Sequence, residues 1–497
     1  MSLLLTTLSR RVAALASGVL LPLAFAPFEL FWLAPLSLAG LFLLWEEQSP
    51  REAAVLGCFY GIGAFALGTY WLHISLRQLG GAPIPIVILL MSALVLAMSA
   101  YSALAGFIAA RLAGVSGPFR WLIVLPALWT VVEWLRGWLF TGFPWLSLGY
   151  SQTDTPLLAW APLLGVYGVT WVVALLAGCF VLLVRGTGVR SRVASVACIV
   201  GIVLLSWQLQ QISWTEPREL SLRVGLVQAA IPQELKWTAA QRQPTLDYYR
   251  DTTLALDSPD LVIWPEAAIP ALPFEVRDFL GDLDAAMAEQ GTQLYSGILT
   301  FDPERREFRN TLMGFGAYTG QYHKRHLVPF GEYFPVPDFV AHWLRLMNLP
   351  SEDVTAGPEG QLPLQVNGIA IAPTVCYEVA FGAEQLSFFP ASELLVNISN
   401  DTWFGDSIAP HQHLQMARLR SIETGRPMLR ATNTGITAVI GADGRIVQRI
   451  PQFEPGALTA EVRPYKGITP YMRYGNSAIV SFCGLLLLLS AVRLRTL

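Results

Sequence analysis

Charged residues are scarce in this chain of 497 residues. Asp, Glu, Lys and Arg make up 14% of it, whereas a soluble globular protein carries roughly 25%. Hydrophobic residues account for 53%, and the mean hydropathy is +0.47. The net charge of −3 leaves no basic excess to neutralise phosphates, which argues against a nucleic-acid partner. This composition is typical of an integral membrane protein.

Phosphate-binding loops and disulfide pairs are also lacking. No glycine-rich loop of the P-loop or dinucleotide type occurs in a strand-turn-helix setting. Of only five cysteines, Cys58, Cys179, Cys198 and Cys483 lie in apolar runs, where cysteine behaves as a small apolar residue. Cys376 alone lies in the polar part of the chain and has no disulfide partner there. Such a thiol is either buried and inert or used in chemistry.

The apolar residues are concentrated at the two ends of the chain. A membrane-spanning helix needs about 20 mostly apolar residues. Seven such runs precede residue 213, and one more follows residue 472. We therefore predict a transmembrane bundle over 1–212, a soluble domain over 213–472, and an eighth helix with a cytoplasmic tail over 473–497. The predicted spans lie near 11–28, 31–46, 53–75, 84–110, 119–140, 160–184, 193–212 and 474–492.

The basic residues of the short loops predict the orientation of these spans. Arginines cluster at the start of the chain and after the second, fourth, sixth and eighth runs, whereas the opposite loops hold only Arg77. The positive-inside rule then places both termini in the cytoplasm. The domain over 213–472 faces outward, which in a bacterium is the periplasm. The run after Arg10 and Arg11 also resembles a signal peptide, but it merges into the next run as a retained helix would.

Two features of the apolar and soluble parts leave alternatives open. Glu133 and Arg136 lie at i, i+3 spacing near the end of the fifth run, as an ion pair or as a functional pair. We favour the ion pair. The segment Pro337 to Pro350 is apolar on most faces of a helix. It is either core or an exposed lid that dips into the membrane.

The soluble part alternates strand patterns with helical ones, which predicts a layered fold of sheets and helices. His411 to Thr424 has helical periodicity, and an Asp-Gly turn at 443–444 predicts a hairpin. The predicted strands are 220–227, 261–264, 294–301, 310–317, 368–374, 394–398, 437–440 and 445–447.

Three polar residues stand in notable positions among these elements. Cys376 follows an apolar strand directly, as nucleophiles at strand ends do. Glu266 ends the short strand that begins at Leu261 in the same way. Lys324 lies in the stretch from Tyr322 to Glu332. About 50 to 60 residues separate the three positions, so only folding would unite them.

These stretches carry a family resemblance. The motifs around Glu266, Lys324 and Cys376 are similar to the Glu-Lys-Cys triad of the nitrilase superfamily. The membrane runs and the motif Asn397 to Gly405 narrow the match, and nearly the whole chain resembles the apolipoprotein N-acyltransferases, a membrane-bound branch of that superfamily. The resemblance implies a helical membrane bundle of about eight spans joined to a nitrilase-like α-β-β-α sandwich.

The resemblance also implies a reaction and its residues. Glu266 would be the general base, Lys324 would stabilise the oxyanion, and Cys376 would form a thioester. Trp237, Glu332, Tyr377 and Glu378 would support them, although Glu332 could instead order a loop and Trp237 could simply pack. The acyl donor would be a phospholipid, with phosphatidylethanolamine expected, and the acceptor the α-amine of an S-diacylglyceryl-cysteine apolipoprotein. No cofactor is expected.

A metal site and two other functions compete with this interpretation. His411 and His413, at i, i+2, do not share a helix face, so a two-histidine metal site is not expected. A membrane-tethered amidase or nitrilase would use the same triad with water as acceptor, but would not require so large a bundle. A transporter or receptor with a binding domain predicts that the triad is dispensable.

Overall fold

The computed structural model describes residues 7–112, 114, 117–186, 188–334 and 353–496. The chain divides into two compact units. The first comprises Met1–Trp71, Pro85–Ser213 and Arg473–Leu497, and the second comprises Leu72–Ile84 and Trp214–Met472. The apolar segment 337–350, predicted as core or lid, lies outside the described residues.

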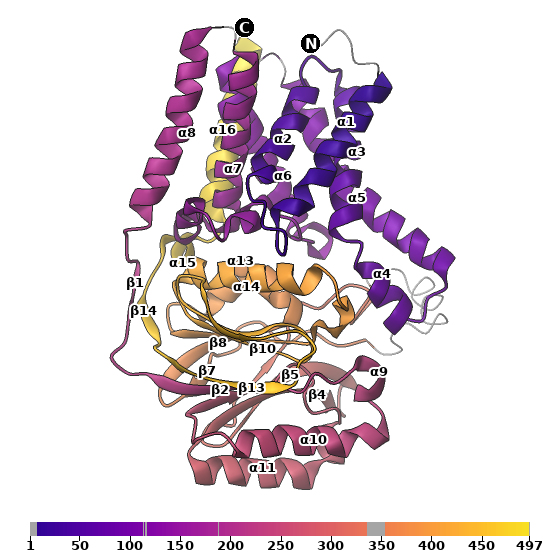
Figure 1. Ribbon diagram of the computed structural model, residues 1–497, viewed down its shortest axis with the longest axis vertical. Helices are drawn as coiled ribbons and strands as arrows, with labels where there is room; N and C mark the ends of the chain where they lie inside the picture. The colour runs from indigo at the N-terminus through magenta and orange to yellow at the C-terminus, as the bar shows by residue number, and fades with distance from the viewer. Residues whose placement is uncertain (1–6, 113, 115–116, 187, 335–352, 497) are drawn as a thin grey trace. The chain divides into compact units, whose positions relative to one another are not determined.

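The first unit is helical (Figure 1). Short 3₁₀ or π turns extend or connect its helices at Leu21–Ala24, Arg120–Val124, Leu139–Thr141, Leu148–Gln152 and Pro156–Trp160. The helices are α1 (Thr7–Leu20), α2 (Leu33–Leu44), α3 (Pro50–Gly68), α5 (Ile84–Arg111), α6 (Leu125–Arg136), α7 (Ala161–Arg185), α8 (Val189–Leu209) and α16 (Ser477–Thr496).

A helix lies at each of the eight predicted spans, but not all of these helices meet the length and apolarity that crossing requires. In the described residues three do: Ile84–Arg111, Pro156–Arg185 and Val189–Leu209. The apolar helices Leu33–Leu44 and Ser477–Val492 are shorter. The count of eight spans therefore stays a prediction.

The third predicted span, 53–75, is shorter than expected. Helix α3 ends at Gly68, and Leu72–Ile84 belong to the second unit. There they form α4 (Leu72–Ile74) and a π turn (Ser75–Leu79). The Ser75 hydroxyl donates to the Trp403 carbonyl oxygen at 2.5 Å. Leu72–Ile84 therefore pack within the second unit rather than continuing the apolar run.

Small residues set the close approach of the first helices. A Cβ on Gly18 of α1 would clash with the Tyr60 carbonyl of α3, and a Cβ on Gly57 of α3 would clash with the Ser102 carbonyl of α5. Backbone-to-backbone approach of this kind drives helix association where no hydrophobic effect operates between helices.

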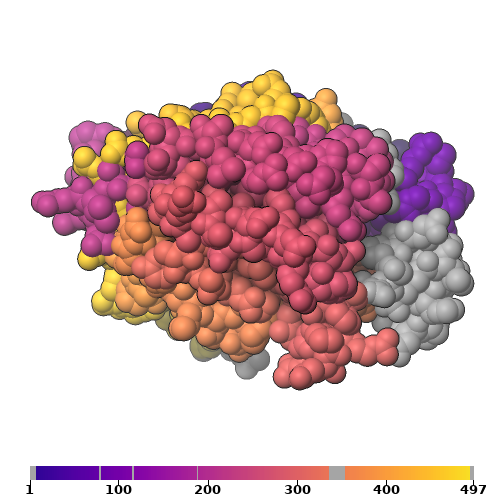
Figure 2. All heavy atoms as spheres, turned by 90° about the horizontal axis from the view of Figure 1, so that it is seen from below, coloured from indigo at the N-terminus to yellow at the C-terminus, as the bar shows by residue number. Residues whose placement is uncertain are grey.

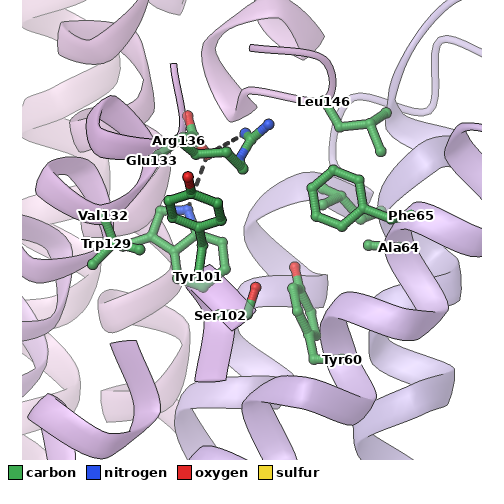
Figure 3. Close-up of a pocket in the computed structure, with 11 residues that line it drawn as sticks. Tyr60, Ala64, Phe65, Tyr101, Ser102, Trp129, Val132, Glu133, Arg136 and Leu146 are labelled. Atoms are coloured by element: carbon green, nitrogen blue, oxygen red, sulfur yellow. Dashed lines mark hydrogen bonds and ion pairs between the residues drawn. The ribbon is translucent and has the colours of Figure 1, made fainter. Parts of the chain in front are cut away.

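The predicted Glu133–Arg136 pair is present, but loosely. The Arg136 Nη2 lies 4.0 Å from the Glu133 Oε2, and both side chains are buried (Figure 3). Glu133 instead accepts hydrogen bonds from the Thr170 hydroxyl at 2.6 Å and from the Leu148 backbone N–H at 3.0 Å. The Trp129 indole donates to it at 3.2 Å. The acid therefore ties helices α6 and α7 to the loop between them.

Arg136 forms hydrogen bonds with the same loop. Its Nη1 donates to the Phe143 and Trp145 carbonyl oxygens, each at 2.6 Å. Its Nη2 lies 3.3 Å from the Ser147 hydroxyl. The pair is thus a clamp for the 143–148 loop, a structural role close to the favoured ion-pair interpretation. Both residues also line a pocket with Leu21, Tyr60, Ala64, Phe65, Tyr101, Ser102, Trp129, Val132 and Leu146.

The second unit contains two six-stranded sheets and a two-stranded ribbon of β1 (Thr215–Pro217) with β14 (Tyr465–Gly467). The first sheet has the order β13-β2-β3-β4-β5-β6, with β13 Gly456–Val462, β2 Leu222–Gln228, β3 Leu261–Ile263, β4 Gln293–Asp302, β5 Glu307–Phe315 and β6 Gln321–His323. The second has the order β12-β11-β10-β9-β8-β7, with β12 Ile446–Ile450, β11 Thr437–Ile440, β10 Met428–Thr432, β9 Leu394–Ser399, β8 Ile369–Val375 and β7 Leu364–Val366.

Helices cover the outer faces of both sheets (Figure 1). On the first sheet, α10 (Ala239–Leu254) and α11 (Arg277–Gln290) bury Leu246, Tyr249, Leu283 and Met287 against Val262 and its neighbours. Their magenta-to-red residues occupy the middle of the face in Figure 2. On the second sheet lie α13 (Gly382–Gln385) and the almost wholly buried α14 (Ala409–Thr424). The short α9 (Gln233–Lys236) precedes α10, and α15 (Pro470–Tyr474) precedes α16.

Parallel pairing places the carboxyl ends of neighbouring strands at the same edge of each sheet. Strands β2, β3 and β4 run parallel, as do β8, β9 and β10. The predicted pair 294–301 and 310–317 is confirmed as the antiparallel β4 and β5, and the predicted hairpin as β11 and β12. The helix predicted over 411–424 is confirmed as α14. Loops that follow parallel strands meet at the carboxyl edge of a sheet, where open sheets bind ligands.

Replacing Arg136 tests the loop clamp. We expect Arg136→Met to destabilise the protein by about 3–5 kcal/mol, because it leaves the buried Glu133 without its countercharge and two carbonyls without donors. Thermal unfolding in detergent micelles measures the loss. The exposed Arg51 of α3 provides the matched control, and Arg51→Met should melt like the wild type. Equal melting temperatures for all three proteins would contradict the clamp.

Candidate active site

Glu266 lies in the turn that follows β3 and is 7% exposed. Its carboxylate has two fixed donors. The Asn310 amide donates to Oε1 at 2.6 Å, and the Asn400 backbone N–H donates to Oε2 at 2.8 Å. Its backbone carbonyl oxygen accepts from the Lys236 ammonium at 3.1 Å. Two segments therefore orient the carboxylate, and a third holds the main chain of Glu266.

Gly297 of β4 allows this turn to approach the sheet. A Cβ at position 297 would lie 2.6 Å from the Glu266 Cα and 2.6 Å from the Ala267 backbone nitrogen. The Gly297 N–H also donates to the Pro265 carbonyl at 3.1 Å. Ala267 adopts a φ of 47°, a left-handed conformation that costs energy for a residue with a side chain. The turn that carries Glu266 is thus both crowded and strained.

Lys324 follows β6 and is 1% exposed. Its ammonium lies 3.6 Å from the Glu266 Oε1 and 2.9 Å from the Glu332 carboxylate. Burial alone would lower the pKa of Lys324, but the Glu332 and Glu266 carboxylates outweigh burial and hold it above its ordinary value. The lysine therefore carries a permanent positive charge inside the protein.

Cys376 begins the turn after β8, with a φ of 53° and 7% of its surface exposed. Burial, together with the Glu266 carboxylate, raises the pKa of the Cys376 thiol, while Lys324 opposes the rise. The thiol is thus protonated at neutral pH and needs a base before it can act as a nucleophile. Its electrostatic interaction with both Glu266 and Lys324 shows that folding brings the three residues together.

Polar side chains contact the backbone carbonyl oxygen of Cys376. Its carbonyl oxygen lies 3.2 Å from the His413 Nε2 of α14 and 3.5 Å from the Asn397 amide of β9. The His413 Nδ1 lies 2.9 Å from the Asp401 Oδ1, and the Arg430 guanidinium donates to the Asp401 Oδ2 at 2.8 Å. Arg430 and His413 outweigh burial and hold the pKa of Asp401 well below its ordinary value. These buried residues fix the strained turn at Cys376.

Glu332 and Glu378, predicted as supporting residues, have distinct positions. Glu332 pairs with Lys324 and also accepts from the Val328 backbone N–H at 2.8 Å, so it both balances the lysine and orders its own loop. Glu378 lies two residues after the thiol and accepts from the Val375 backbone N–H at 2.7 Å. It accepts from the Arg325 backbone N–H at 2.7 Å as well. Glu378 therefore joins the segment that carries Cys376 to the one that carries Lys324.

Tyr377 and Trp237 lie at the margins of the site. The Tyr377 ring is buried and contacts the rings of Phe381 and His326, with centroids 4.9 Å and 5.7 Å apart. Trp237 follows α9 and is 49% exposed. In the part of the chain that the structure describes, its indole makes no hydrogen bond or ring contact. Its support for the site stays a prediction.

Several residues of the site were not predicted from the sequence. Asn310 bridges the two carboxylates, since its amide also lies 3.3 Å from the Glu332 Oε1. Asn400 acts through its backbone N–H, and Lys236 through a buried ammonium. Asn400 lies in the motif Asn397 to Gly405 and Lys236 directly precedes Trp237, but nothing in the sequence showed that either residue would contact Glu266. Within the described ranges, no group of three or more His, Cys, Asp or Glu residues could hold a metal ion.

Two family models cover most of the chain. One, described as the apolipoprotein N-acyltransferase N-terminal domain, matches residues 17–179, and the other, described as carbon-nitrogen hydrolase, matches 223–466. The apolipoprotein N-acyltransferase of Methylococcus capsulatus is 43% identical over 473 residues, which cover 95% of this chain and 93% of the relative. That of Vibrio cholerae is 40% identical over 496 residues and 97% of either chain.

Gly297 offers a test of the Glu266 turn. We expect Gly297→Ala to slow any reaction that depends on Glu266 by at least about tenfold, because displacing catalytic groups by about 1 Å can cost up to 10²-fold. Gly281 of α11 has no heavy atom within 4 Å of an added Cβ, so Gly281→Ala is the matched control. Alkylation of Cys376 by iodoacetamide, followed by mass spectrometry of its peptide, measures the effect. Equal rates for both variants would contradict the close approach.

Proposed function

Because the chain belongs to the apolipoprotein N-acyltransferase family, we propose that it transfers a fatty acyl chain from a phospholipid to an apolipoprotein. The acceptor is the N-terminal α-amine of an S-diacylglyceryl cysteine, and Cys376 carries the acyl group as a thioester in between. The observation that supports the proposal is that Glu266, Lys324 and Cys376 are buried and interact with one another. A buried thiol beside a fixed carboxylate and a fixed ammonium suits covalent acyl transfer.

The first half-reaction acylates the enzyme. Glu266 accepts the Cys376 proton, and the sulfur attacks the carbonyl carbon of the donor ester. Negative charge develops on the carbonyl oxygen, and the Lys324 ammonium stabilises it. The ester C–O bond then breaks, Glu266 returns its proton to the departing oxygen, and a lysophospholipid leaves. The raised pKa of Cys376 supports this sequence, since a protonated thiol requires the base.

The second half-reaction passes the acyl chain on. The neutral α-amine attacks the thioester carbonyl, and Glu266 accepts a proton from the nitrogen. The C–S bond breaks, an amide remains on the acceptor, and the sulfur regains its proton from Glu266. The two halves share one site, which gives ping-pong kinetics. Glu332 keeps Lys324 charged throughout, and Glu378 keeps the two segments in register.

The membrane setting of the reaction is part of the proposal. Both proposed substrates are anchored in the membrane, which accounts for a bundle of about eight spans in the same chain as a catalytic domain. We propose the bacterial inner membrane as the location, with the domain over 213–472 in the periplasm and both termini in the cytoplasm. The arginines of the alternate loops support this orientation. Phosphatidylethanolamine is the proposed donor, and an amidase that uses water as acceptor is the alternative.

Intact-mass spectrometry after incubation with phosphatidylethanolamine tests the thioester. We expect a fatty-acyl mass gain that hydroxylamine removes, because a thioester is labile to that nucleophile. Cys376→Ala should show no gain, whereas Cys198→Ala, which alters a bundle cysteine, should behave as the wild type. No adduct on a folded wild type with a free thiol would favour the amidase.

Substitution of the base tests the assigned proton transfer. We expect Glu266→Gln to slow single-turnover acylation by about 10²–10⁴-fold, as loss of general base catalysis does. Glu289→Gln, which changes an exposed acid of α11, should leave the rate unchanged. Rapid-quench measurement of the acyl-enzyme gives both rates. An unaltered rate in Glu266→Gln would refute the role of the base.

A further inference from the structure

Lysine is used sparingly in this chain. Only three of its 33 basic residues are lysines: Lys236, Lys324 and Lys466. Lys466 is exposed on β14, but the other two are buried, at 2% and 1% exposure. Both buried ammoniums contact Glu266, Lys324 at the carboxylate and Lys236 at the backbone carbonyl oxygen. The reaction outlined above uses Lys324 and leaves Lys236 without a role.

The Lys236 ammonium is held in an unusual way. It donates to the Glu266 carbonyl at 3.1 Å, and no carboxylate lies at ion-pair distance within the described ranges of the chain. A buried ammonium is costly unless it is paired and fully hydrogen-bonded. An apolar side chain of similar length would fill the same space without that cost. The retained charge therefore points to a task that packing alone does not explain.

The helix that carries Lys236 is also linked to Glu266 indirectly, through Asn400. Gln233, three residues earlier on α9, accepts from the Asn400 side-chain amide at 2.9 Å. The Asn400 backbone N–H in turn donates to the Glu266 Oε2 at 2.8 Å. Lys236 thus secures the main chain of Glu266, while Gln233 secures the residue that orients its carboxylate. Together they hold a turn that Ala267 strains.

We propose that Lys236 is a positioning residue of the active site, whose buried positive charge fixes the Glu266 main chain so that its carboxylate meets the Cys376 thiol. The inference rests on the proposed role of Glu266 as the base for Cys376. It assigns the second lysine to the geometry of the base, in contrast to Lys324, which acts on the substrate oxygen. The charge matters because a charge-assisted hydrogen bond is about twice as strong as a neutral one.

The charge of Lys236 gives the proposal a pH signature. Burial lowers the pKa of Lys236 to about 8, with Glu266 opposing the shift. The ammonium is therefore charged at pH 7 and becomes a neutral amine as the pH rises through about 8.

The other groups around the base have their own partners. Lys324 after β6 and Cys376 after β8 interact electrostatically with Glu266, Glu332 pairs with Lys324, and Asp401 faces Cys376. The pKa values of Lys324 and Cys376 are raised, and that of Asp401 is lowered. None of these three shifts lies in the direction that would bring a charge change near pH 8.

The test is the rate of Cys376 alkylation by iodoacetamide in the full-length protein in detergent, measured from pH 6.5 to 9.5. We expect Lys236→Met to react about 10- to 100-fold more slowly than the wild type at pH 7, as loss of a charged hydrogen bond implies. The ratio of wild-type to variant rates should fall toward one as the pH rises through about 8. The ratio cancels the ionisation of the thiol itself. Lys466→Met is the matched control, with a ratio of one throughout.

Lys236→Gln keeps a donor without the charge, and it serves as the readout if Lys236→Met does not melt cooperatively. It should be slowed less and show the same decline of the ratio with pH. A ratio near one at pH 7 would overturn the proposal. A ratio that stays equally high at pH 6.5 and 9.5 would also overturn it, because it reports structural damage alone. The assay needs no phospholipid, so a wild type that alkylates normally but forms no acyl adduct refutes the proposed function and not this inference.

Discussion

The pairing of the buried Lys324 ammonium with the Glu266 and Glu332 carboxylates is the interaction on which the candidate active site depends. Burial opposes the charge of Lys324, and the two carboxylates outweigh burial and hold the pKa of this lysine above its ordinary value. Asn310 links the two acids from the middle of β5 and accepts from the Lys324 backbone N–H through its own carbonyl at 2.8 Å. Lys324, its two carboxylate partners and Asn310 thus form one buried network.

The sheets supply the geometry that this network needs. Glu266 follows β3 in one sheet, and Cys376 follows β8 in the other, both at the carboxyl ends of parallel strands. Each of the two residues lies in or beside a left-handed turn, at Ala267 and at Cys376 itself. Strain of this kind persists only where the surroundings over-determine it. The close approach of Gly297 constrains the turn at Ala267, and the hydrogen bond between His413 and the Cys376 carbonyl oxygen constrains the turn at Cys376.

The sequence predicted the residues whose position depends on a strand end and missed those whose position depends on register or burial. Cys376 and Glu266 could be located because each follows a short apolar strand. Asn310 could not, because its role follows from its place in β5, paired with Leu299 of β4. Asn400 acts through its backbone N–H, and the residue type alone does not reveal the role of a backbone donor. The bundle shows the same limit: the spacing of Glu133 and Arg136 predicted a pair, while the loop that both residues hold became visible only in the fold.

The central claim is that one acyl group passes through Cys376 on its way from lipid to amine. Its most direct test starts from acyl-enzyme charged with an isotope-labelled acyl chain and freed of donor lipid, to which an S-diacylglyceryl-cysteine peptide is added. The account predicts that the label leaves Cys376 and appears on the peptide α-amine at the same rate. Label that stays on the enzyme, or that leaves as free fatty acid while the peptide stays unmodified, would contradict it.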